Sequence, residues 1–234
     1  METFWLGVIW YAAFLLSTTL HEAAHALAAM KMGDKTAYYA GQVTVDPFPH
    51  IRREPLGMVL VPILSFLYGG YTWMLGWASA PYDPFWARKY PKRAAYMALA
   101  GPLANLALVL LSVAAIHLGL YLEIFFEPNR IITSSVVGTY DASLPTTLAT
   151  FVSVMFSLNL LLFLFNLIPL PPLDGSNLYP FIVGEETAHK IMDFLQQPGI
   201  GIIGLVIAWF LFDDIFGPVH LFAINLLYPG LTYE

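Results

Sequence analysis

Two histidines and a glutamate near the amino terminus have a spacing that suits a shared metal ion. His21, Glu22 and His25 lie in the segment His21-Glu22-Ala23-Ala24-His25, an H-E-x-x-H pattern. Side chains four residues apart lie on one face of a helix, so both imidazoles can bind one ion. Glu22 lies about 100° further around the same helix, close enough to reach a water on that ion. The pattern predicts a metal site with a carboxylate that can act as a general base.

Two histidines do not complete such a site, because catalytic zinc typically has three protein ligands and an open fourth position. The apolar runs of the chain contain almost no carboxylates. Asp174 stands out because it follows a long apolar run and the proline-rich stretch Pro169-Leu170-Pro171-Pro172. Prolines remove backbone donors and hold a chain extended, which favours a carboxylate fixed near the first helix. The alternative is an ordinary turn, since Asp174-Gly175 is a common turn pair.

The remainder of the chain is apolar enough to lie in a membrane. Of its 234 residues, 58% are hydrophobic and 11% are charged, against about 25% charged in soluble domains. Several uncharged runs of at least 18 residues can each cross an apolar layer of about 30 Å. The net charge of −6, with no basic patch carrying aromatics, argues against nucleic-acid binding. The composition predicts an all-α, multi-pass membrane protein with a single membrane-embedded domain over residues 1–234.

The expected elements follow from apolar runs and the residues that end them. We expect core helices over about 3–32, 94–120 and 143–170, and a further helix over about 199–213. The first run lacks the basic start and the cleavage site of a signal peptide, so we expect it to be a mature helix. Residues 36–46 partly alternate β-branched or aromatic with polar side chains, which predicts a short strand or hairpin. The last run has Gly217-Pro218 and Pro229-Gly230 near its ends and predicts a packed or interfacial segment.

The basic residues indicate how the middle of the chain enters the membrane. Eight of the ten Lys and Arg residues fall in two loops, namely Lys31, Lys35, Arg52 and Arg53, and then Arg88, Lys89, Lys92 and Arg93. The positive-inside rule places both loops on the cytoplasmic side. The apolar run at about 56–80 lies between them, so we expect it to be re-entrant, with its turn at Pro62 or Gly69-Gly70. The alternative is an ordinary crossing that violates the charge rule.

The positions of the candidate ligands lead to the same topology. His21 and His25 lie toward the C-terminal end of their helix, and Asp174 follows the C-terminal end of its own. These groups meet only if both helices run in the same direction, with one full crossing between them at about 94–120. The run at about 56–80 is then re-entrant, and the metal site lies toward the cytoplasmic side of the cell membrane.

With these residues the chain resembles the site-2 proteases, zinc metalloproteases that cut within membranes. The resemblance rests on the H-E-x-x-H segment, on Gly101-Pro102-Leu103-Ala104-Asn105, and on Asn166-Leu167-Ile168-Pro169 followed by Leu173-Asp174-Gly175. These motifs lie on the three expected core helices, in the same order along the chain as in the family. Residues 43–60 look like the compact prokaryotic members, and nothing resembles a PDZ or CBS domain.

The resemblance implies a role for each candidate residue. His21, His25 and Asp174 are the implied ligands of one zinc ion. Glu22 is the implied general base, Asn166 lies beside the catalytic centre, and Asn105 helps to shape the substrate cleft. His50 lies where compact members often carry histidine, and from its loop it can approach the zinc or gate access.

The implied substrate is a transmembrane segment of another protein, cut to release a membrane-tethered regulator. Such a segment has to unwind locally, and its freed backbone groups need partners. The strand expected within residues 38–45 can supply them as an edge that accepts an extended peptide.

Two alternatives remain open on the sequence alone. One is a different membrane-embedded H-E-x-x-H protease, with Glu185 or Glu186 as the third ligand. The other is a metal-handling transporter in which His and Asp side chains form an ion path. Such transporters more often have repeated halves with paired broken helices, and no internal symmetry is present in this sequence.

Overall fold

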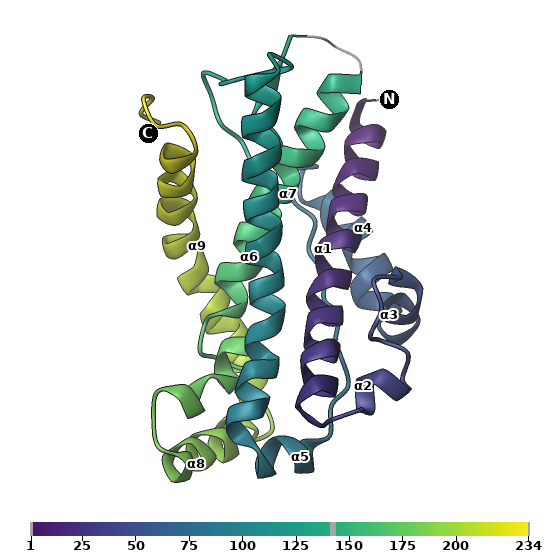
Figure 1. Ribbon diagram of the computed structural model, residues 1–234, viewed down its shortest axis with the longest axis vertical. Helices are drawn as coiled ribbons and strands as arrows, with labels where there is room; N and C mark the ends of the chain where they lie inside the picture. Colours follow the sequence, from purple (N-terminus) through teal and green to yellow (C-terminus); the bar gives the residue numbers. More distant parts are fainter. Residues whose placement is uncertain (1, 141–143, 234) are drawn as a thin grey trace.

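A bundle of long helices dominates the computed structural model, which describes residues 2–140 and 144–233 (Figure 1). The long helices are α1 (Glu2–Met32), α6 (Pro91–Tyr121), α7 (Leu144–Asn166) and α9 (Ile200–Leu227). α1, α6 and α7 pack against one another, and each is long and apolar enough to cross a membrane. α1 and α7 run in one direction and α6 in the other (Figure 1). The predicted all-α, multi-pass architecture is confirmed, although α7 ends at Asn166 instead of near residue 170.

Short elements connect these helices. They are α2 (Thr36–Tyr39), α3 (Pro47–Arg53), the π-helical η1 (Leu56–Leu60), α4 (Val61–Tyr68), α5 (Pro84–Lys89), β1 (Phe125–Phe126), β2 (Gly138–Thr139), the 3-10 helices η2 (Asp174–Asn177) and η3 (Tyr179–Phe181), and α8 (Glu185–Leu195). β1 and β2 pair antiparallel in the connection between α6 and α7. α5 and α8 lie at the opposite end of the bundle from the two chain termini (Figure 1).

The end of α1 is set by local hydrogen bonds. Gly33 has a φ of +109°, and the N–H groups of Gly33 and Asp34 donate to the carbonyls of Met30 and Ala29. This is the Schellman pattern, in which a left-handed glycine ends a helix. The Asp34 carboxylate then accepts from the Thr36 N–H at 2.9 Å and from the Thr36 hydroxyl at 2.6 Å. These bonds start a helical turn directly after α1.

The prediction of a strand within residues 36–46 is therefore wrong. Thr36–Tyr39 form the helical turn α2, and the Gln42 N–H donates back to the Ala37 carbonyl. Local bonds of this kind give backbone groups the partners that a strand would need from a neighbour. The strand pairing in the described residues involves β1 and β2 instead. The edge strand expected at 38–45 for substrate binding is absent.

Residues 56–80 form a hairpin, as the sequence predicted. η1 and α4 lead away from α3, and the chain turns at Gly69-Gly70-Tyr71, where Gly70 and Tyr71 have φ values of +70° and +64°. The chain then returns without regular secondary structure to Asp83. Pro62 lies in the first turn of α4 and takes no part in the reversal.

Backbone packing holds the two arms of this hairpin together. The Leu75 N–H donates to the Ser65 hydroxyl at 2.9 Å, and the Trp77 N–H donates to the Gly57 carbonyl at 3.1 Å. A Cβ on Gly76 would lie 2.3 Å from the Gly57 carbonyl oxygen. The arms therefore approach at a distance that only glycine permits.

The loops on either side of the hairpin meet at one end of the bundle. Arg93 Nη1 donates to the Met32 carbonyl at 3.2 Å, and the Asp83 N–H donates to Asp34 Oδ2 at 2.8 Å. Entry and exit of the hairpin thus lie on the same side, as the charge pattern predicted for a re-entrant segment.

α9 is longer than predicted. It meets α8 at 92° and then continues through Gly217-Pro218 to Leu227, where the sequence predicted a break after about residue 213. An internal proline costs a helix one hydrogen bond, which neighbouring helices in a membrane compensate. Ile224, Leu227 and Tyr228 are buried in a cluster with α6 and α7. Packing thus keeps the last part of the chain helical.

Candidate metal centre

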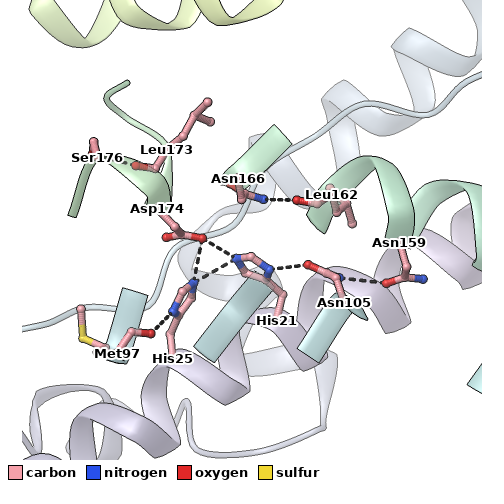
Figure 2. A network of polar contacts seen from close by, with 10 residues as sticks. All are labelled: His21, His25, Met97, Asn105, Asn159, Leu162, Asn166, Leu173, Asp174 and Ser176. Carbon is pink, nitrogen blue, oxygen red and sulfur yellow. Dashed lines mark hydrogen bonds and ion pairs between the residues drawn. The ribbon is translucent and has the colours of Figure 1, made fainter. Parts of the chain in front are cut away.

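The two histidines and the aspartate predicted as ligands converge on one point (Figure 2). The Nε2 atoms of His21 and His25 lie 2.9 Å apart. Oδ2 of Asp174 lies 3.1 Å from the first and 3.3 Å from the second. Ligand atoms about 2.0–2.1 Å from a tetrahedral ion such as zinc lie about 3.3 Å from one another. The triangle formed by these three atoms has the size of a metal site.

The hydrogen bonds of the imidazoles leave lone pairs at this point. Nδ1 of His21 lies 2.6 Å from Asn105 Oδ1, and Nδ1 of His25 lies 2.7 Å from the Met97 carbonyl oxygen. Both partners accept, so each Nδ1 carries the proton and each Nε2 presents a lone pair. Neither Nε2 has a proton to give, and Asp174 Oδ2 is buried without a hydrogen-bond partner. Three lone pairs that face one another in this way are stabilised by a bound cation.

Gly101 on α6 provides the space for this site. A Cβ at this position would lie 2.3 Å from His25 Nε2 and 2.5 Å from His21 Nε2. A side chain would therefore fill the place where the two nitrogens meet or displace the rings. Sequence reasoning noted Gly101 within a family pattern and missed this contact. The available signal was a glycine beside Pro102 inside an otherwise helical run.

Glu22 lies close to the ligand atoms without being the nearest carboxylate. One of its oxygens lies within 4.8 Å of a ring nitrogen of each histidine, and its side chain is buried. By this proximity Glu22 itself groups with the histidines as a candidate ligand. We favour Asp174 as the third ligand because its oxygen is closer to both nitrogens. The position of Glu22 leaves room for a water molecule between it and a bound ion.

Asn166 is the last residue of α7 and takes part in a local bond. Its Nδ2 donates to the Leu162 carbonyl at 3.0 Å (Figure 2). A side-chain amide has two N–H groups, so this bond leaves one of them for a further acceptor.

Asn105 lies in the interior of the bundle, beside His21. It is fully buried, and its amide bonds to His21 at 2.6 Å and to Asn159 at 2.8 Å. A residue with no exposed surface cannot line a substrate cleft in this conformation. Its expected role in shaping the cleft stays a prediction, and the structure places its side chain against His21.

Other predicted candidates lie in different surroundings. His50 lies in α3 and is buried, with its Nε2 3.1 Å from the Thr44 carbonyl oxygen. Glu186 is exposed and pairs with Lys190 at 2.8 Å, and the side chain of Glu185 lies outside the described residues. Among the described residues, the carboxylates found beside His21 and His25 are those of Glu22 and Asp174.

Sequence reasoning also missed three residues that support the site. Met97 accepts from His25 through its carbonyl, and Asn159 and Ser17 continue the hydrogen bonds that start at Asn105. The available signal for Asn159 was its position in a long apolar run, since polar side chains within membrane helices are costly and usually have a function.

The fold and this site define a class, the membrane-embedded metallopeptidases. The family model described as "Peptidase family M50" matches residues 9–211. The chain therefore belongs to peptidase family M50, the site-2 protease family.

Curated relatives agree with this membership. The chain is 33% identical over 187 residues to "Putative zinc metalloprotease YwhC" of Bacillus subtilis, which covers 80% of this chain and 68% of the relative. It is 28% identical over 209 residues to "Putative zinc metalloprotease Rip2" of Mycobacterium tuberculosis, which covers 89% of this chain and 70% of the relative. The protein of the same name from Mycolicibacterium smegmatis is 26% identical over 196 residues, which covers 84% of this chain and 65% of the relative. No solved structure matches.

Proposed function

We propose that this protein is a zinc-dependent intramembrane protease that hydrolyses peptide bonds within or near transmembrane segments of membrane proteins. The observation that carries the proposal is the convergence of Nε2 of His21, Nε2 of His25 and Oδ2 of Asp174 beside the buried carboxylate of Glu22. Membership of the peptidase family and the names of the relatives support the same chemistry.

His21, His25 and Asp174 would hold one zinc ion. Two imidazoles and one carboxylate suit zinc and leave a fourth position open, and the chain has no cysteine that would offer a thiolate. When bound, zinc supplies Lewis-acid activation of water and of the scissile carbonyl at neutral pH. The side chain of Asp174 is 20% exposed and those of the histidines 9%, so the Asp174 side is the side of access for water and peptide.

Glu22 acts as the general base in this proposal. It accepts a proton from the attacking water and returns a proton to the leaving amine of the cut peptide. Asn166 directs its second N–H to the oxygen of the scissile carbonyl as negative charge develops there. Removing one such donor commonly costs about 3 kcal/mol of transition-state stabilisation.

The substrate is a transmembrane segment that has unwound near the scissile bond, since helical amides are otherwise inaccessible to the site. His21 and His25 lie toward the end of α1 at which the basic loops meet. By the positive-inside rule this end is cytoplasmic. Cleavage there would release the cytoplasmic part of a tethered regulator, as in regulated intramembrane proteolysis.

The test compares wild type with Glu22→Gln on a model transmembrane substrate, and measures cleavage and bound zinc in the same samples. We expect about one zinc ion per chain in both proteins and a loss of cleavage of about 10²–10⁴-fold in the variant. Glu186→Gln is the matched control, because its carboxylate is exposed on α8, and it should cleave normally. A wild type that binds zinc and cleaves no transmembrane substrate would favour the transporter alternative.

A further inference from the structure

A series of buried polar side chains links His21 to α7 (Figure 2). Ser17 on α1, Asn105 on α6 and Asn159 on α7 are each 0% exposed. Polar side chains in the apolar interior of a membrane bundle are costly unless every donor and acceptor has a partner. These three are satisfied mainly by one another, so their bonds form one connected network across the three core helices.

The hydrogen bonds of this network have a definite direction. Asn105 Nδ2 donates to Asn159 Oδ1 at 2.8 Å. Asn159 Nδ2 donates to the Met155 carbonyl at 2.8 Å and to Ser17 Oγ at 2.9 Å. The Ser17 hydroxyl points to the sulfur of Met155 at 3.8 Å, so Ser17 is free to accept from Asn159.

The Met155 carbonyl fixes this direction because a carbonyl can only accept. The nitrogen of Asn159 has to face it, so the oxygen of Asn159 faces Asn105. Asn105 then has to present its nitrogen to Asn159 and its oxygen to His21. A neutral His21 consequently keeps its proton on Nδ1 and presents the lone pair of Nε2 to the metal site.

The other histidine ligand obtains the same orientation more simply. His25 Nδ1 bonds directly to the Met97 backbone carbonyl, which cannot exchange a donor for an acceptor. Asn105 can do so by rotating its amide by half a turn. A free Asn105 would then offer N–H groups to Nδ1 of His21 and favour the tautomer whose Nε2 carries a proton. The network is thus needed at His21 and has no counterpart at His25.

We propose that Asn105 and Asn159 are positioning residues that hold His21 in its metal-binding tautomer, with the Met155 carbonyl setting the direction of the hydrogen bonds. The inference rests on the proposed function insofar as it takes His21 as a metal ligand. It differs from ordinary interhelical hydrogen bonding, which would hold helices together in either amide orientation.

The test measures zinc affinity in detergent, by competition with a chelating dye, for a set of variants. Asn159→Leu frees the Asn105 amide, and we expect zinc affinity to fall about 10–100-fold, as for other groups that orient metal-binding histidines. Asn105→Asp added to this variant should restore the affinity to within a few-fold of wild type, because a carboxylate facing Nδ1 of His21 can only accept. Ser112→Ala is the control, since Ser112 is a buried polar residue of α6 that bonds only within its own helix, to Leu108.

The rescue separates positioning from a merely structural role. If the asparagines only join helices, Asn105→Asp restores none of the interhelical bonds that Asn159→Leu removes and it buries a charge, so the double variant should be no better than Asn159→Leu. That result would overturn the proposal. If Asn159→Leu does not fold, Asn159→Ala replaces it, alone and with Asn105→Asp, because the proposal again predicts a fall in zinc affinity and its recovery, whereas interhelical bonding predicts no recovery. A wild type without zinc would contradict the proposed function, whereas normal zinc affinity in Asn159→Leu would contradict the positioning role alone.

Discussion

The two sides of the metal centre are built from different kinds of structure. On the α6 side, Gly101, the Met97 carbonyl and Asn105 hold the two imidazoles in a buried layer between long helices. On the opposite side, Asp174 comes from the short helix η2 after a proline-rich stretch, and its side chain is 20% exposed. The buried side determines ligand geometry, and the more exposed side leaves room for water and peptide. Changes on the buried side should therefore weaken or abolish metal binding, whereas some changes on the exposed side should lower hydrolysis with the metal still bound.

The largest effect is expected for Gly101→Ala on the buried side. The added Cβ would lie 2.3 Å from Nε2 of His25, so one or both rings have to leave the site. We expect no zinc to co-purify and no detectable cleavage, measured by metal analysis and by a substrate assay. Gly217→Ala in α9 is the matched control, because a Cβ there meets nothing within 4 Å, and it should keep both properties. Normal zinc content in Gly101→Ala would contradict the geometry of the site.

Asp174→Asn tests the exposed side and should have the next largest effect. The amide keeps the shape of the side chain and loses the charge that stabilises a divalent cation. Zinc affinity should fall by about 100-fold or more, since even the groups that only orient ligands contribute about 10–100-fold. A zinc titration of the purified variant checks this. Unchanged affinity would show that another group supplies the third ligand.

Asn166→Ala should separate hydrolysis from metal binding. Its amide lies at the end of α7 and makes one bond to Leu162, so its loss leaves the three ligand atoms in place. We expect kcat to fall about 100-fold with zinc content unchanged, in line with the removal of one donor to a developing oxyanion. Wild-type kcat in this variant would exclude the role.

Asp34→Ala should have the smallest effect. Asp34 connects the loop that follows α1 with the loop before α5 through hydrogen bonds from Thr36 and Asp83, and it does not contact the metal centre. Burial raises the pKa of the Asp34 carboxyl, and hydrogen bonds from Thr36 and Asp83 lower it by more, so the pKa lies below its ordinary value. We expect the variant to lose about 1–3 kcal/mol in the free energy of unfolding at pH 7, with zinc content retained.

The pH dependence of this difference follows from the direction of the pKa shift. A depressed pKa stabilises the fold above the ordinary value of about 4 and ceases to do so as the pH falls through the folded-state value. The gap between wild type and Asp34→Ala in denaturant unfolding should therefore be full at neutral pH and should shrink from about pH 4 downward. A gap that is constant down to low pH would contradict this account.

The elements that the sequence predicted well are those that the membrane constrains most. The three core helices follow from apolar runs, because a buried backbone in lipid has to be helical. The hairpin over residues 56–80 follows from two basic loops that the charge rule places on one face. The sequence could predict that His21, His25 and Asp174 lie close together, because the directions of the two helices limit which of their ends can meet.

The sequence predicted less well the segments whose structure depends on particular side-chain contacts. Thr36 starts a helical turn because the Asp34 carboxylate accepts from it, a bond that strand propensity does not include. Gly217-Pro218 stays within α9 because neighbouring helices pack against its last turns. The role of Asn105 depends on which side chain it faces across helices, and no spacing within α6 contains that information.

The most direct test of the central claim is zinc X-ray absorption spectroscopy on the purified protein and on His25→Ala. The account predicts two imidazole nitrogens at about 2.0–2.1 Å and oxygen ligands at about 2.0–2.2 Å in the wild type, with one imidazole lost in the variant. A wild-type spectrum without imidazole scattering, or one that His25→Ala leaves unchanged, would contradict the assignment of His21, His25 and Asp174 to a single ion.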